Sequence, residues 1–110
     1  MIEDTLAKLD RRVRQISALS DEKKNELGAL LETLKEEVVA LAETKAGDAE
    51  SITRFTELSA HEVTREDGSD RLKTLSLEGL SASVDGFEAS HPRLVQIVNN
   101  VCTSLANLGI

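Results

Sequence analysis

Tryptophan and tyrosine are absent from this chain of 110 residues, and Phe55 and Phe87 are its only aromatic residues. Nucleic-acid-binding proteins stack bases on aromatic rings, and protein-binding hot spots favour tryptophan and tyrosine. A hydrophobic core in this chain has to be aliphatic, and such side chains pack well between helices without polar partners. A chain of this length buries about two-thirds of its unfolded surface on folding, which is enough for one domain.

Cysteine and long apolar runs are scarce as well. Cys102 is the only cysteine, so no disulfide can form within the chain, which favours a reducing compartment. No stretch approaches the roughly 18 uninterrupted apolar residues of a membrane-spanning helix. The first residues show no basic leader followed by an apolar run. We therefore expect no signal peptide, no membrane partner and a cytoplasmic location.

Basic residues are outnumbered, with 13 lysines and arginines against 20 acids and a net charge of −7. An acidic chain is repelled by nucleic-acid backbones and by anionic lipid headgroups. The one basic cluster consists of Arg11, Arg12 and Arg14. It fits a solvated helix face paired with nearby carboxylates better than it fits a nucleic-acid contact. We therefore expect no nucleic-acid partner.

Apolar residues recur at alternating steps of four and three in three separate stretches. This spacing places each set on one stripe of an α-helix, as in helical bundles and coiled coils. The stretches are Ile2, Leu6, Leu9, Val13 and Ile16; Leu27, Leu31, Leu34, Val38 and Leu41; and Leu94, Val98, Val101, Leu105 and Leu108. The pattern predicts an all-α fold, a small bundle of four to five helices in a single domain over residues 1–110.

The first two stretches predict a helical hairpin over residues 1–46. The first helix should run from about Ile2 to Leu19, and Ser20 should cap the second. The second helix should continue to about Ala46, where Gly47 stops it. At about 1.5 Å per residue it is roughly 40 Å long and outreaches its partner. Its overhang then needs cover, either from the rest of the chain or from a second copy.

Residues 47–69 form a variable segment in this interpretation. Several serine and threonine side chains fall there, and short hydroxyl side chains compete for the hydrogen bonds of a helix backbone. We expect a short or frayed helix, ended by a break at residues 67–69.

Residues 70–110 should form a C-terminal helix pair. The first helix should run from about residue 70 to 89, and Pro92 fits the first turn of the second, with Ser90 or His91 as its cap. The apolar register continues through the proline, so one long helix kinked at Pro92 is the alternative. At the C-terminus, Gly109 is expected in a left-handed conformation just past the helix, with Ile110 folding back onto Leu105.

Two short motifs lie near the end of the chain, Phe-Glu-Ala-Ser-His-Pro at residues 87–92 and Leu-Ala-Asn-Leu-Gly-Ile at residues 105–110. Together they resemble the C-terminal signature of a family of small bacterial proteins, the domain of unknown function 4404. The resemblance implies a short, soluble, helical bacterial protein with a leucine-rich N-terminal hairpin and a corner at the His-Pro step. It implies no substrate, no catalytic residue and no partner.

The spacing of histidines and acids argues against a metal site. His61 and Glu62 begin like a zinc-protease motif, but Arg65 stands where the second histidine belongs. A di-iron bundle needs a Glu-x-x-His motif on each of two helices. Glu88 and His91 form one such motif, but Leu58 stands three residues before His61, the only other histidine. We therefore expect no metal, no cofactor and no catalytic residue, and we interpret the protein as non-enzymatic.

Glu88, His91 and Arg93 form a small polar cluster at the predicted corner and are the candidate partner-binding residues. His91 is interpreted first as a structural cap. The leading hypothesis is protein–protein association, as a homo-oligomer (dimer or higher) or with another protein, because the overhanging helix needs cover. The alternative is a small-ligand-binding bundle in which these three side chains line a pocket. A nucleic-acid regulator using the arginine cluster conflicts with the net charge.

Overall fold

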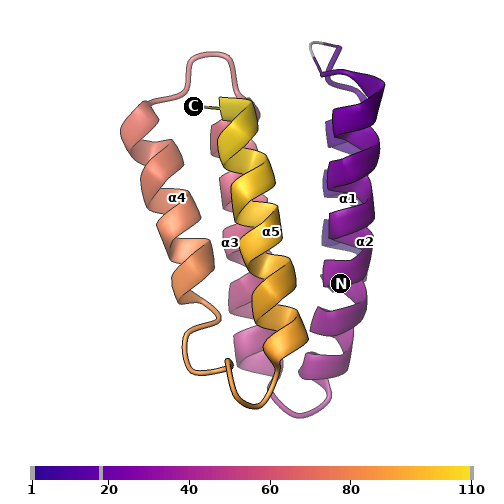
Figure 1. The fold of residues 1–110 in the computed structure, drawn as a ribbon, viewed down its shortest axis with the longest axis vertical. Coiled ribbons are helices and arrows are strands. Elements are labelled where there is room, and N and C mark those ends of the chain that lie inside the picture. Colours follow the sequence, from indigo (N-terminus) through magenta and orange to yellow (C-terminus); the bar gives the residue numbers. More distant parts are fainter. Residues whose placement is uncertain (1, 18, 110) are drawn as a thin grey trace.

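The computed structural model describes residues 2–17 and 19–109 and contains five α-helices in that part of the chain (Figure 1). The helices are α1 (Ile2–Arg14), α2 (Asp21–Ala42), α3 (Ala46–Thr64), α4 (Asp70–Ala82) and α5 (Pro92–Gly109). The predicted all-α bundle is confirmed. Successive helices run in opposite directions, with α4 at one edge of the bundle and α1 and α2 at the other. Within the described residues, no helix combines the length and the apolar character needed to cross a membrane.

The N-terminal hairpin forms as predicted, but its first helix is shorter. The Oγ atom of Ser20 accepts a hydrogen bond from the backbone nitrogen of Lys23 at 3.2 Å, so Ser20 caps α2. Helix α1 ends at Arg14, whereas the apolar pattern predicted about Leu19. A helix reaching Leu19 leaves no residues for the reversal of the chain before the cap, and helix–helix connections need two or more.

Helix α2 also ends early, at Ala42, and the prediction that Gly47 stops it is wrong. The carbonyl of Leu41 accepts hydrogen bonds from the nitrogens of Thr44 and Lys45 at 3.1 and 2.8 Å. The backbone therefore closes this helix end without a glycine, and Gly47 lies inside the first turn of α3.

The apolar stripe of α2 is covered by its own chain. Its five seam residues are at most 3% exposed, and helices α1, α3 and α5 pack around it. They are Leu27, Leu31, Leu34, Val38 and Leu41. The expected overhang therefore needs no second copy, and this reason for an oligomer no longer holds.

Helix α3 spans 19 residues where only a short or frayed helix was expected, so that prediction is wrong. Its buried threonines do not compete with the helix. Thr53 and Thr56 each donate a hydrogen bond to the carbonyl four residues earlier, at 2.9 and 2.7 Å. Ser59 donates to the backbone oxygen of Ser76 on α4 at 2.9 Å. The hydroxyl groups of these side chains therefore all donate hydrogen bonds to backbone carbonyls. Because the side chains are short, they let the helices approach closely.

The C-terminal pair is two helices joined by a corner, and a single kinked helix is ruled out. Helix α4 ends at Ala82, not near residue 89, and α5 begins at Pro92. Between them Gly86 adopts a φ of +93°, which side chains other than glycine rarely tolerate. Val84 and Phe87 lie in this connection and are nevertheless buried, so their predicted place in the core is correct. Gly109 is the last residue of α5, so the prediction that it lies just past the helix is wrong, and the expected return of Ile110 falls outside the described residues.

Candidate functional site

The three candidate residues of the corner have separate contacts. Glu88 Oε2 accepts a hydrogen bond from the backbone nitrogen of Gly86 at 2.9 Å, so this carboxylate fixes the tight turn. Arg93 Nε lies 3.1 Å from Glu37 Oε1, an exposed ion pair that joins the start of α5 to α2. Exposed pairs of this kind contribute little stability.

His91 has the structural role expected of a cap. Its carbonyl accepts the first hydrogen bond of α5, from Val95 N at 3.2 Å, which identifies His91 as the residue that precedes the helix. Its ring packs edge-on against Phe87 with the centroids 5.5 Å apart. Its Nδ1 atom lies 2.9 Å from Ser90 Oγ. The contacts of Glu88, His91 and Arg93 thus shape the corner and lead to different groups.

A groove of about 440 Å³ lies between α2 and α5, away from this corner. Polar groups from Asn100, Asn107, Thr33 and Glu26 line it together with apolar side chains from α2. The three corner residues are not among its lining side chains. The geometry therefore gives no support to a ligand pocket built from Glu88, His91 and Arg93.

A different surface stands out on α3 and α4. In the part of the chain that the structure describes, four large apolar side chains remain more than a third exposed, and all four lie on these two helices. They are Phe55 (37%), Leu58 (44%), Leu72 (43%) and Leu75 (46%), hereafter the α3/α4 face. Single exposed apolar residues are common, whereas a cluster of them marks an interaction site.

The register of the two helices brings these side chains to one side of the bundle. Each pair is three residues apart on its helix and so shares one side of it. The helices are antiparallel, with Ser59 bonded to Ser76, and the ring of Phe55 lies over Gly79. A Cβ atom at Gly79 would lie 2.5 Å from that ring, so a larger residue there would displace the ring.

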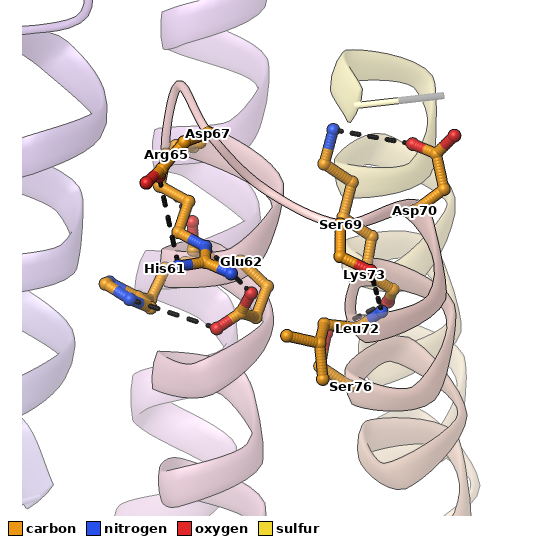
Figure 2. A network of polar contacts seen from close by, with 11 residues as sticks. His61, Glu62, Arg65, Asp67, Ser69, Asp70, Leu72, Lys73 and Ser76 are labelled. Atoms are coloured by element: carbon orange, nitrogen blue, oxygen red, sulfur yellow. Dashed lines mark hydrogen bonds and ion pairs between the residues drawn. The ribbon is translucent and has the colours of Figure 1, made fainter.

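A charged cluster borders one end of the α3/α4 face (Figure 2). Glu62 is 8% exposed, and its Oε1 atom lies 3.0 Å from Arg65 Nε. The two atoms are buried and not aligned as a hydrogen bond, so charge holds the pair. His61 Nε2 lies 3.9 Å from the other oxygen of Glu62. Arg65 thus supplies a cation at the position where a zinc-protease motif needs a histidine.

A family model described as "Domain of unknown function (DUF4404)" matches residues 27–110. The chain belongs to this family. The DUF4404 match includes most of α2 and all of α3, α4 and α5, so it contains both the corner and the α3/α4 face. Helix α1 and its arginines precede it. No curated protein and no solved structure matches the chain.

The basic cluster before the DUF4404 region is partly engaged within the protein. Arg14 Nε lies 3.1 Å from Asp10 Oδ1, and its guanidinium also donates to Asn25 at 3.2 Å. The same group passes over Gly28, where a Cβ atom would collide with it. This arrangement agrees with the interpretation of the cluster as a solvated, paired helix face.

Cys102 is half-buried on α5, with its Sγ atom 3.8 Å from the carbonyl of Leu77. Burial raises the pKa of the Cys102 thiol to about 11, so the thiol stays protonated at neutral pH. Since the thiolate is the nucleophile, this geometry argues against covalent chemistry there.

The α3/α4 face was missed in the sequence because the segment of residues 47–69 was not expected to form a long helix. A signal was nevertheless present. Leu58 and Leu75 are leucines that lie off the buried stripe of their helices, on the side next to it. A leucine beside the stripe widens the apolar surface beyond what the bundle itself covers.

Proposed function

We propose that this protein is non-enzymatic and acts by protein–protein association, joining a second copy of itself through the α3/α4 face. The observation that carries the proposal is the clustering of all four exposed large apolar side chains on two adjacent helices. Closed, symmetric pairs of identical chains are the commonest assemblies of soluble proteins.

The energetics are consistent with a weak, reversible dimer. Burying a whole leucine or phenylalanine side chain stabilises by roughly 1.5–3 kcal/mol. About two-fifths of each side chain in the face is still exposed. Eight such side chains, four from each copy, therefore supply roughly 5–10 kcal/mol. Loss of free motion on association costs about 4–15 kcal/mol, so the balance is small.

The single copy does not depend on this association to fold. The stripe of α2 and most of the stripe of α5 are buried inside the chain, and the core has contributions from all five helices of the described part. Association then joins copies that are already folded. The fraction of dimer rises with concentration, as expected of a reversible assembly.

The test is the mass in solution, measured by light scattering on a sizing column over a hundredfold range of concentration. We expect the unmodified chain to rise from 12.0 kDa towards twice that mass, and Leu58→Glu to stay at 12.0 kDa. Gln96→Glu is the matched control, because it adds the same charge at an exposed position of α5. A dimer that Leu58→Glu leaves intact would show that another surface is used.

A further inference from the structure

Helix α4 is the least buried helix of the bundle. Among its 13 residues only Ser76 and Leu80 are buried, fewer than for any other helix in the described part of the chain. It packs against α3 and α5 alone and lies at the edge of the bundle (Figure 1). Its outer side, where Leu72 and Leu75 are exposed, therefore has apolar surface that a partner can cover.

The outer side of α4 is self-complementary about Leu75. Leu72 lies three residues before this leucine and Gly79 four residues after it. Arg71 lies four residues before it and Glu78 three residues after it, both exposed on the neighbouring side of the helix. When two identical helices run antiparallel and cross at Leu75, each Arg71 meets the Glu78 of the other copy, and each Leu72 meets the Phe55 ring that lies over the other Gly79.

We infer that the α3/α4 face of one copy packs on the same face of a second copy, with the two α4 helices antiparallel across a two-fold axis at Leu75. The arrangement rests on the proposed self-association and adds its geometry. The leucines of both copies and the two Phe55 rings then share one apolar centre between four helices. Each Arg71–Glu78 pair occurs twice, once on either side of the axis.

Charge favours a second copy at this place. The chain carries −7, so two copies repel one another over most of their surface. Helix α4 carries two acids, Asp70 and Glu78, and two bases, Arg71 and Lys73, and is therefore neutral. It offers the identical chain a surface without net repulsion.

Charge also selects this arrangement over the other two-fold packing, in which α4 lies on α3 of the second copy. Ser59 faces Ser76 and Phe55 lies over Gly79, so Arg71 is level with residues 63 and 64, next to Arg65. Placing α4 on the other copy's α3 would therefore bring two arginines together. The antiparallel α4 pair instead sets each arginine beside a glutamate.

The first experiment is disulfide trapping in the full-length chain with Cys102→Ala. Leu75→Cys places the two new thiols together at the axis, so mild oxidation should link most of the protein as a dimer that reductant separates. Thr74→Cys is the matched control, because it adjoins Leu75 in sequence but projects from α4 roughly 100° away from it, on the side opposite to Leu72 and Gly79. We expect no link from it.

The second experiment exchanges the charges. Arg71→Glu alone and Glu78→Arg alone should each raise the dissociation constant about tenfold, because two rim pairs become repulsive. The double variant Arg71→Glu/Glu78→Arg should restore the original value. A structural role of either residue within one copy would not give this rescue.

The outcomes separate the geometry from the proposed function. If the chain dimerises but Leu75→Cys does not link with itself, while a mixture of Leu75→Cys and Leu58→Cys chains does, the antiparallel α4 pair is wrong and self-association stands. If the chain stays at 12.0 kDa at all concentrations, both are wrong. Self-linking of Leu75→Cys together with the charge rescue would establish the arrangement.

Discussion

Replacing Leu75 with alanine should weaken association more than it weakens the fold. In the single copy 46% of this side chain is exposed, and that share is the part that a partner covers. Since a whole leucine contributes roughly 1.5–3 kcal/mol, the covered share gives about 0.7–1.4 kcal/mol per copy. Because the two-fold axis places this leucine in the interface twice, the lost free energy of association is doubled. The dissociation constant should therefore rise about 10- to 100-fold.

The assay for Leu75→Ala is sedimentation equilibrium, with urea unfolding at low concentration to follow the single copy. The folded single copy should lose no more than about 1.5 kcal/mol, the share of the leucine that contacts its own bundle. Val39→Ala, a half-buried position on α2, removes similar atoms away from the face. Equal dissociation constants for the two variants and the unmodified chain would refute the reasoning.

Four further outcomes are expected from the fold. Leu80 is fully buried, so Leu80→Ala should lower the free energy of unfolding by about 2–5 kcal/mol, read from the urea midpoint. Gly86 has a φ of +93°, so Gly86→Ala should cost about 1–2 kcal/mol in the same assay. Gly47→Ala, with nothing within 4 Å of the added atom, should cost nothing. Burial raises the pKa of Cys102 from 9.0 to about 11. The stability that its protonated thiol contributes is therefore complete below pH 9 and lost as the pH rises through 11. Unfolding at pH 8 and above pH 10, compared with Cys102→Ala, should show this loss only with the cysteine present.

Apolar periodicity identified the buried faces because burial on one side of a helix is what produces the period. Leu34 and Val98 are fully buried, as their place in the stripes predicted. The same pattern did not locate the helix ends. Val84 and Phe87 keep the period beyond the end of α4 and are buried in the connection. The pattern records which residues are covered, and a covered residue need not be helical.

Helix α3 shows where local propensity was overridden. Its hydroxyl side chains lower the preference for a helix when they are free to compete with the backbone. In the bundle Thr53 and Thr56 bond within their own helix, and Ser59 bonds to α4. Packing against the other helices supplies the stability that propensity does not, and this contribution is not visible in the local sequence.

The contacts and the exposure of the candidate residues depend on how the helices pack, which is not evident from the local sequence. Glu88, His91 and Arg93 are close along the chain, yet their side chains contact Gly86, Ser90 and Phe87, and Glu37. The α3/α4 face is the reverse case, because its two halves are separated along the chain by the connection between the helices. Which leucines stay exposed depends on how many helices surround them, and this is a property of the folded bundle.

The most direct test of self-association is sedimentation equilibrium of the unmodified full-length chain over a hundredfold range of concentration. We predict an average mass that rises with concentration from 12.0 kDa towards twice that value and fits a reversible dimer. A mass of 12.0 kDa at every concentration would contradict self-association through the α3/α4 face.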